Sequence, residues 1–126
     1  MRVRGFLARR GRLPKSDVRQ YEADALVDTG AASLIVPRFV VEKLGLELVG
    51  KKRAELVTGD IVILGVTEPI EAHLDGRTVT LDALMTGNEV LIGKMVLEAT
   101  DMQVDCTKRR LIPNPAHPDG PVLKLK

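Results

Sequence analysis

The chain has 126 residues, of which 44% are hydrophobic and 29% charged, and this composition predicts one globular domain with a single apolar core. The formal net charge of +2 is too small to indicate a nucleic-acid or membrane partner by itself. The single cysteine, Cys106, cannot form an internal disulfide. One cysteine and two histidines are too few for a cluster with zinc-like spacing, and the sequence has no glycine-rich phosphate loop. We therefore expect no metal and no cofactor.

The amino-terminal segment is basic and has no apolar run long enough for a secretory signal or a bilayer span, which predicts a cytoplasmic protein without a membrane partner. We interpret the first twenty residues as a solvated, partly flexible arm; its basic residues are Arg2, Arg4, Arg9, Arg10, Arg12, Lys15 and Arg19. The alternative is a site for an anionic partner. Aromatic residues, at 2%, are too few for base stacking, so nucleic acid is not expected.

Short β-rich runs separated by glycines predict a mostly β fold. In chain order, strands are expected over 3–7, 18–27 and 34–36, followed by a helix that starts at Pro37 and ends at Gly45. Two hairpins come next. The first joins 53–57 to 61–66 through Thr58-Gly59-Asp60, and the second joins 70–74 to 78–84 through Asp75-Gly76-Arg77.

The last third of the chain begins with a strand over 90–92 that ends at Gly93. One or two helical turns are expected over 94–100, and a last strand pair over 102–105 and 110–112. Residues 1–113 then form the domain. Residues 114–126 form a proline-rich tail that we expect to be a linker or loop, in which 122–125 could pair as an edge strand.

The tripeptide Asp28-Thr29-Gly30 lies between the runs 25–27 and 31–36, which are apolar or small. At average residue frequencies it occurs by chance in about one chain of this length in fifty. Chance occurrences usually fall in polar turns, and a surface hairpin turn is the alternative interpretation. A carboxylate within an apolar run costs free energy unless it is hydrogen-bonded, paired or functional. The pattern therefore favours a functional carboxylate on a tight turn at the end of a buried strand.

In the order of its parts the chain resembles the retroviral-type (retropepsin-like) aspartic proteases, and the small bacterial members more than the viral ones. The parts are 26–31 with Asp28-Thr29-Gly30, Val36-Pro37 opening a helix that ends in 43–46, the hairpin at 54–66, 90–93 followed by a short helix, and Asp105 before a short strand. The resemblance implies a closed, barrel-like, mostly β acid-protease fold with one or two short helices. It also implies that one chain supplies half of an active site.

The implied chemistry is hydrolysis of peptide bonds by an endopeptidase that uses two carboxylates sharing one proton, because like charges a few ångströms apart cannot both ionise cheaply. A second carboxylate of this kind is absent from the sequence: Asp75-Gly76 and Asp119-Gly120 lack the intervening Thr or Ser. An active enzyme is therefore expected to be a homodimer with Asp28 of each subunit at its twofold axis. Thr29 would bond to the partner's loop, and Gly30 would allow the tight turn.

The resemblance also implies that the hairpin at 54–66 is a flap over a peptide or protein substrate. Substrate contacts are then expected from Ala31, Ala32, Val57, Thr58, Gly59, Asp60 and Leu91. The alternatives are an ordinary exposed hairpin for the flap and a pure core position for Leu91. Viral members usually carry an acidic residue where this chain has Ala32 and an Arg where it has Lys94, and Met95 replaces a residue that is often polar or acidic in the family. A non-catalytic, dimeric peptide-binding module that retains the fold is therefore the alternative function.

Overall fold

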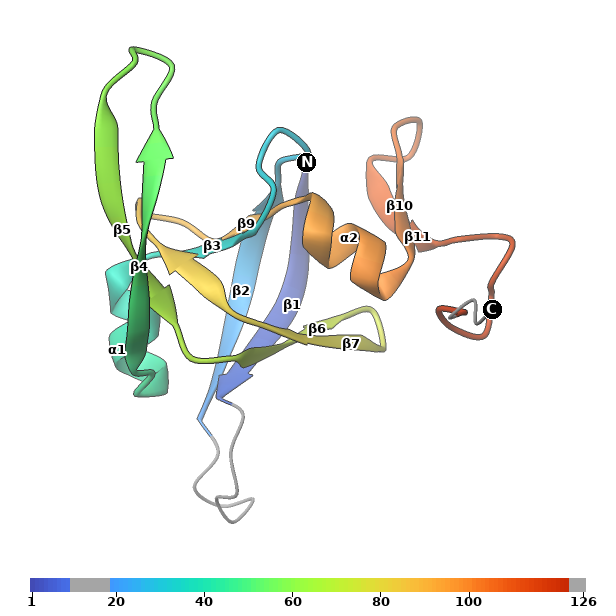
Figure 1. The fold of residues 1–126 in the computed structure, drawn as a ribbon. Helices are drawn as coiled ribbons and strands as arrows, with labels where there is room; N and C mark the ends of the chain where they lie inside the picture. Colours follow the sequence, from blue (N-terminus) through green and yellow to red (C-terminus); the bar gives the residue numbers. More distant parts are fainter. Residues whose placement is uncertain (10–18, 123–126) are drawn as a thin grey trace, which may run out of the picture.

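Strands supply most of the regular structure in the computed structural model, which describes residues 1–9 and 19–122 (Figure 1). The elements are β1 (Arg2–Arg9), β2 (Gln20–Val27), β3 (Leu34–Val36), α1 (Arg38–Leu44), β4 (Leu48–Glu55), β5 (Ile61–Thr67), β6 (Ile70–Leu74), β7 (Arg77–Leu81), β8 (Ala83–Met85), β9 (Leu91–Ile92), α2 (Lys94–Thr100), β10 (Met102–Asp105) and β11 (Arg110–Pro113). The mostly β expectation is confirmed, and so are both helices.

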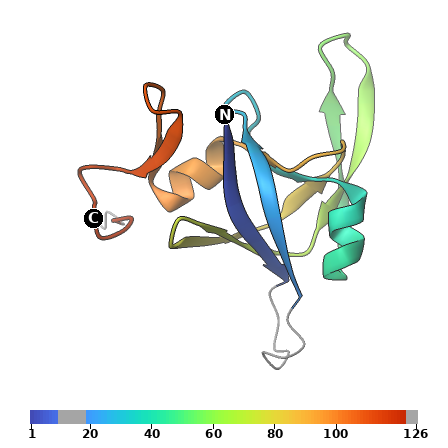
Figure 2. The ribbon, with the colours of Figure 1, turned by 180° about the vertical axis from the view of Figure 1, so that it is seen from behind.

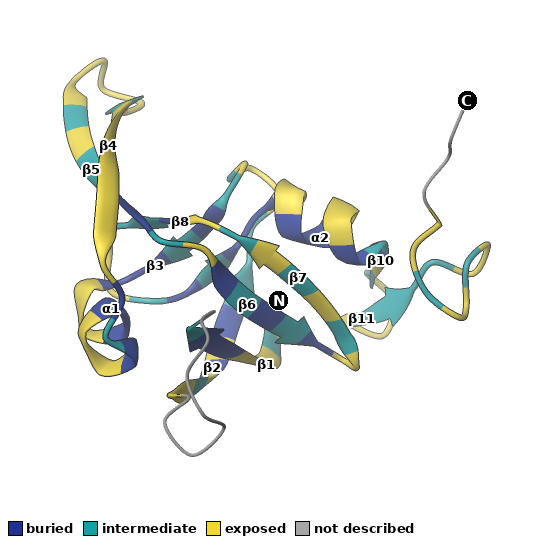
Figure 3. Cartoon of the chain, turned by 60° about the horizontal axis from the view of Figure 1, so that its bottom comes forward, coloured by how far each residue is buried: buried dark blue, intermediate teal, exposed yellow. Residues whose placement is uncertain are grey.

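Nine of these strands form one sheet in the order β4-β5-β8-β3-β9-β2-β1-β6-β7, and β10 and β11 form a separate antiparallel pair. Pairing within the described residues therefore leaves two ends, β4 and β7, and does not close the sheet into the expected barrel. The reason is that β4 pairs only with β5, in a hairpin that projects from the body of the molecule (Figure 1). The hairpin is exposed along most of its length (Figure 3).

The expectation of one continuous strand over 78–84 is wrong, because the structure has two strands, β7 and β8, separated by Asp82. Before Asp82, β7 pairs with β6 in a hairpin; after it, β8 runs parallel to β3 and antiparallel to β5. The buried hydroxyl of Thr67 accepts a hydrogen bond from the Ala83 N–H at 3.0 Å, which satisfies a backbone donor at the change of partner.

The expectation that the first twenty residues form a solvated, partly flexible arm is wrong for residues 2–9. Arg2, Arg4 and Arg9 lie in β1, where Arg9 pairs with Glu68 at 3.0 Å, so this half of the segment is a strand in the sheet. The other half, with Arg10, Arg12 and Lys15, and the beginning of the expected strand at residue 18 lie outside the described residues. So does most of the edge strand expected over 122–125.

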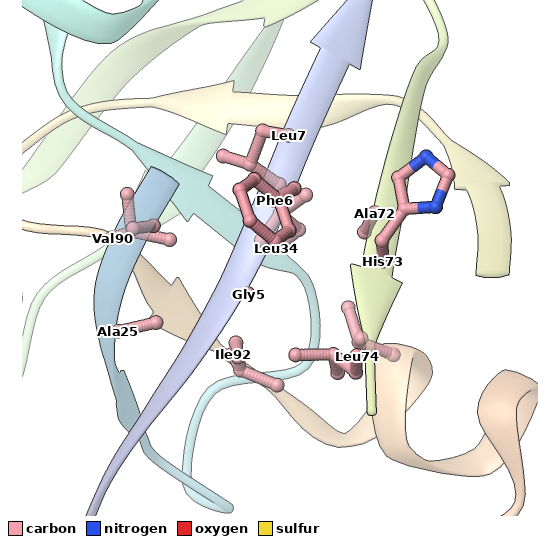
Figure 4. Close-up of a pocket in the computed structure, with 12 residues that line it drawn as sticks. Gly5, Phe6, Leu7, Ala25, Leu34, Ala72, His73, Leu74, Val90 and Ile92 are labelled. Carbon is pink, nitrogen blue, oxygen red and sulfur yellow. The ribbon is translucent and has the colours of Figure 1, made fainter. Parts of the chain in front are cut away.

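The core lies between the sheet and the inner faces of the two helices. Val40, Val41 and Leu44 of α1 are buried, and so are Val96 and Leu97 of α2. A cavity of about 10 Å³ remains beside β1 (Figure 4). It has room for about one water molecule, and its lining is almost wholly apolar, so we interpret it as a packing gap of the core. Gly5 borders the cavity, and a Cβ there would lie 2.8 Å from the His73 carbonyl oxygen.

Candidate active site

Asp28 stands directly after β2, an interior strand of the sheet that pairs with β1 on one side and β9 on the other. Its N–H continues the pairing with β9 by donating to the Ile92 carbonyl oxygen at 3.0 Å. The chain then reverses. The Gly30 N–H donates to Asp28 Oδ1 at 2.9 Å, and the Ala31 N–H donates to the Asp28 carbonyl oxygen at 3.1 Å. The expected tight turn at the end of a strand is therefore present, with one carboxylate oxygen used to close it.

The turn rests on the segment that joins β9 to α2. The first two N–H groups of α2 have no partner within the helix, and they donate to the turn: Lys94 N–H to the Ala31 carbonyl oxygen and Met95 N–H to that of Ala32, both at 2.9 Å. Four backbone bonds from Asp28, Ala31, Lys94 and Met95 thus fix the turn over residues 28–32. The turn over residues 28–32 is therefore held by the distant segment around Ile92, Lys94 and Met95 as well as by its own residues.

Gly93 is the residue that lets this contact form. A Cβ at this position would lie 2.5 Å from the Ala31 carbonyl oxygen and 2.9 Å from the Ala32 carbonyl carbon, and still closer to the Ser33 carbonyl oxygen. The backbone of Gly93 is ordinary, with φ −92° and ψ −175°, so the requirement for glycine is one of space. Sequence reasoning placed Gly93 at the end of a strand and missed this role; its only signal was a glycine between an apolar run and a helix.

The residues of the turn face outward to different degrees. Asp28 and Ala31 are half-buried, whereas Thr29, Gly30 and Ala32 are exposed. Within the described residues, no hydrogen bond to the Thr29 hydroxyl or to Asp28 Oδ2 is present. One carboxylate oxygen and one hydroxyl per chain are thus available on an open surface.

Leu91, a predicted wall residue, lies in β9 opposite both Leu26 of β2 and Ile35 of β3, the strands that enter and leave the turn. Its neighbours Val90 and Ile92 line the core cavity and Leu91 does not, in keeping with the alternation of side chains along a strand. Leu91 is half-buried. The side chain of Leu91 therefore lies on the face of the sheet away from that cavity, and Leu91 pairs with Leu26, two residues before Asp28.

The tip of the β4–β5 hairpin carries the other predicted substrate residues, Val57, Thr58, Gly59 and Asp60. All four are exposed, and the Val57 side chain is as exposed as in a free peptide. The tip is closed on itself: the Leu56 N–H donates to the Asp60 carbonyl oxygen, and the Thr58 hydroxyl lies 3.2 Å from Asp60 Oδ2. Within the described residues, no hydrogen bond joins the tip to the Asp28 turn.

The hairpin and the turn nevertheless project on the same side of the molecule, and the turn lies between the β4–β5 hairpin and the β10–β11 hairpin (Figures 1 and 2). The structure therefore brings Asp28, Thr29, Gly30, Ala31 and Ala32 together with Leu91. It places the hairpin tip beside this group without contact.

A second polar cluster, which sequence reasoning missed, holds the start of the tail. Asp101 ends α2 with a left-handed φ of 54°, and its carboxylate accepts from Asn114 Nδ2 at 3.0 Å and contacts His117 Nδ1. Arg77, the first residue of β7, donates to the carbonyl oxygens of Thr100, Asp101 and His117 at 2.7–2.9 Å. Residues 114–122, the described part of the tail, thus contain no helix or strand, and they are anchored as far as His117.

The neighbours of Asp101 in this cluster lower the pKa of its carboxyl group. The hydrogen bond from Asn114 and then that from His117 stabilise the ionised carboxylate and hold the pKa of Asp101 below its ordinary value, with further help from the charges of His117 and Arg77. The residues of this cluster come from three separate parts of the chain: the start of β7, the end of α2 and the tail. For that reason no local sequence motif predicts the cluster.

Among the described residues, no group of three or more His, Cys, Asp or Glu side chains is arranged to hold a metal ion. In the same residues, no helix has the length and apolar character needed to cross a membrane. In the turn over residues 28–32, Asp28 carries the only ionisable side chain.

Comparisons with known proteins establish the fold. The solution structure of the simian foamy virus (mac) protease matches with a TM-score of 0.54 and 15% identity, over 77% of this chain and 91% of that one. The crystal structure of the retroviral protease-like domain of Ddi1 from Leishmania major matches with a TM-score of 0.62 and 17% identity, over 91% of this chain and 88% of that one. No family model and no curated protein sequence matches.

The chain therefore has a retropepsin-like fold, as the order of its sequence motifs predicted. At these identities the likeness concerns the fold and leaves activity to be argued from the site. Neither neighbour is bacterial, so the closer likeness to bacterial members stays a prediction.

Proposed function

We propose that this chain is an aspartic endopeptidase that hydrolyses peptide bonds as a homodimer, with Asp28 of each subunit in one shared site. The observation that carries the proposal is the position of Asp28, on a turn at the end of an interior strand of a retropepsin-like fold. Carboxylates in such a position are costly to keep without hydrogen bonds or a function. Asp28 uses one oxygen to close the turn and leaves the other for chemistry.

The dimer follows from the count of carboxylates. The route needs two aspartates that share a proton, and the sequence has one Asp-Thr-Gly and no Asp-Ser-Gly. Thr29 and Gly30 are exposed at the apex of the turn, so a second turn can approach along a twofold axis. In that arrangement the Thr29 hydroxyl donates to the backbone of the partner's turn.

In the proposed reaction, the ionised Asp28 takes a proton from a water molecule held between the two carboxylates. The protonated carboxyl of the other subunit hydrogen-bonds the scissile carbonyl oxygen and transfers its proton to it as the water oxygen attacks the carbonyl carbon. A tetrahedral diol results, and its collapse with proton transfer to the leaving nitrogen gives a carboxylic acid and an amine.

The substrate would lie as an extended strand between the turn and the β4–β5 hairpin. In this proposal Val57, Thr58, Gly59 and Asp60 close over the peptide, Ala31 and Ala32 contact its main chain, and Leu91 forms part of a wall. Support comes from the placement of the hairpin on the same side as the turn (Figure 1). Its tip is exposed, and within the described residues no hydrogen bond joins it to the Asp28 turn.

A second candidate is a dimeric peptide-binding module without catalysis. Ala32 and Lys94 stand where viral members carry charged partners, and both are exposed. Lys94 makes no ion pair with the described residues. The turn nevertheless keeps the whole tripeptide Asp28-Thr29-Gly30 and the hydrogen bond that closes it, which favours the enzyme.

Cleavage of a random peptide library, scanned from acidic to neutral pH, separates the two candidates. The endopeptidase proposal expects cleavage by the wild type and a loss of at least about 100-fold in Asp28→Asn, because a general acid or base contributes that much or more. Asp24→Asn, four residues earlier on the exposed face of β2, is the matched control and should cleave normally. Tight peptide binding unaffected by Asp28→Asn, with no turnover by a dimeric wild type, would favour the binding module.

A further inference from the structure

A groove with a volume of about 320 Å³ lies between the start of β1 and the start of β11, and it shares one lining residue, Leu74, with the core cavity. Its polar lining is almost entirely basic, with four arginines and one aspartate: Arg2, Arg4, Arg109, Arg110 and Asp75. Val3, Leu74 and Leu111 supply the apolar part of the lining. The groove therefore joins a cationic rim to an apolar surface.

One wall of the groove is an open strand edge. β1 pairs with β2 from Arg2 onward, but it pairs with β6 only from Phe6, because β6 ends at Leu74 and the chain turns away. The Val27 N–H donates to the Met1 carbonyl oxygen, so the alternation of an antiparallel pair directs the backbone groups of Arg2 and Arg4 away from β2. Within residues 1–9 and 19–122 these backbone groups have no backbone partner.

The charge on the rim is only partly compensated. Arg2 pairs with Glu89 at 2.9 Å and Arg4 with Glu22 at 3.4 Å, and all four side chains are at least one third exposed. Such pairs are weak and exchange readily for another carboxylate. Arg109 and Arg110, on the opposite wall, make no ion pair with the described residues. Arg109 is fixed at the turn by a left-handed φ of 53°.

We propose that this groove binds an extended acidic segment of a partner protein, which adds as a strand to the open edge of β1. The peptide backbone would pair with Arg2 and Arg4, while its carboxylates meet the guanidinium groups of Arg109 and Arg110, whose planar forks fit carboxylates in bidentate geometry. Val3 and Leu111 would contact aliphatic side chains of the same segment. The proposal concerns a surface that does not include Asp28 and does not rest on the endopeptidase activity.

The lining favours a peptide over a nucleic acid. In the part of the chain that the structure describes, no aromatic side chain borders the groove, so bases would have no surface there on which to stack. An open strand edge also recognises a polypeptide backbone specifically, through its regular N–H and C=O groups. A phosphate backbone would use the arginines alone.

Fluorescence anisotropy with a labelled, blocked peptide of alternating Glu and Val tests the proposal. Wild type should bind it, with affinity that falls as salt rises, and should not bind a Lys-Val peptide. The double variant Arg109→Gln/Arg110→Gln should bind about tenfold more weakly, the effect of losing two partly exposed ion pairs. Lys51→Gln/Lys52→Gln removes the same charge from the exposed strand β4 and should bind as the wild type does. A Glu-Val peptide N-methylated at alternate residues should also bind more weakly, because it cannot complete the strand pairing.

Equal affinity for the arginine and lysine double variants would overturn the proposal, as would an N-methylated peptide that binds normally. Arg4→Gln, on the other wall, provides a second variant if the first does not fold, as judged by circular dichroism. An oligothymidylate that displaces the peptide and binds more tightly would reassign the groove to nucleic acid. Loss of self-association in Arg109→Gln/Arg110→Gln, without peptide binding by the wild type, would reassign it to a second copy of this chain.

Discussion

The carbonyl oxygen of Ala31 lies only 2.5 Å from where a Cβ would stand on residue 93, so the turn that carries Asp28 packs directly on the backbone of Gly93. Bonds from the first two N–H groups of α2 complete this contact. The position of the candidate catalytic carboxylate therefore depends on a segment more than sixty residues later in the sequence.

This contact predicts the effect of Gly93→Ala. The added methyl group would force the turn and α2 apart, which should lower the free energy of unfolding by about 1–3 kcal/mol, as overpacking usually does. Denaturant unfolding measures the change. Gly50→Ala is the matched control, since nothing lies within 4 Å of a Cβ there, and its change should stay within about 0.5 kcal/mol. Equal stability of the two variants would show that the turn does not need this close approach.

Thr29 is predicted to act on assembly rather than on folding. Its side chain is exposed in the single chain, so Thr29→Val should leave the unfolding of the monomer nearly unchanged. In the proposed dimer two symmetric hydrogen bonds would be lost, worth about 1–3 kcal/mol together, and the dimer dissociation constant should rise at least about fivefold. Sedimentation measures it, with Thr29→Ser as the variant that keeps the hydroxyl. If the valine and serine variants dissociate alike, the hydroxyl has no such role.

The pKa of Asp101 predicts a pH dependence of stability. Because the hydrogen bonds from Asn114 and His117 lower its pKa in the folded chain, ionised Asp101 stabilises the fold above the ordinary aspartate range. This contribution should disappear as the pH falls from about 4 through the lower, folded pKa. The difference in unfolding free energy between wild type and Asp101→Asn should therefore be largest near neutral pH and shrink in acid.

The same account predicts that Asn114→Ala moves the pKa of Asp101 up toward its ordinary value, because the largest stabilising hydrogen bond is gone. A titration of the Asp101 carboxyl carbon by NMR measures this shift. An unchanged titration curve in the variant would contradict the assignment of the cause.

Arg77 is predicted to anchor the start of the tail. It donates to three carbonyl oxygens on two segments, and the planar fork makes this possible. Arg77→Lys should lower the free energy of unfolding by about 1–3 kcal/mol and expose residues 114–122 to limited proteolysis. Arg38→Lys, on an exposed position of α1, is the control. Equal proteolysis of the two variants would show that the tail is held by other contacts.

The sequence predicts those parts of this fold whose signals are local. Gly45 ends α1 with a left-handed φ of 67°, and Asp75-Gly76 and Thr58-Gly59-Asp60 form the two hairpin turns. Asp28-Thr29-Gly30 likewise shows its conformation in its own residues and its apolar flanks. The sequence signal for each of these turns lies in a few consecutive residues, although contacts from Gly93 and the start of α2 also hold the Asp28 turn in the folded chain.

Features that need the assembled fold could not be predicted from the sequence. At Asp82 the chain stops pairing with β6 and starts to pair with β3 and β5, where the Ala83 N–H meets the hydroxyl of Thr67, and no residue near 82 shows this in the sequence. Arg77 reads as an ordinary turn residue until α2 and the tail come beside it. The open edge beside Arg2 and Arg4 exists only because β6 stops at Leu74.

A mixing experiment tests most directly whether two copies of Asp28 form one site. A fixed amount of wild type, well above the dimer dissociation constant, receives an equal amount of Asp28→Asn, and peptide cleavage is measured after the subunits have exchanged. Random pairing leaves about half of the wild-type chains with a wild-type partner, so the account predicts that the rate falls to about half and continues to fall as more variant is added. A rate that stays constant at every ratio would show that each chain cleaves with its own Asp28 alone, and would contradict the shared site.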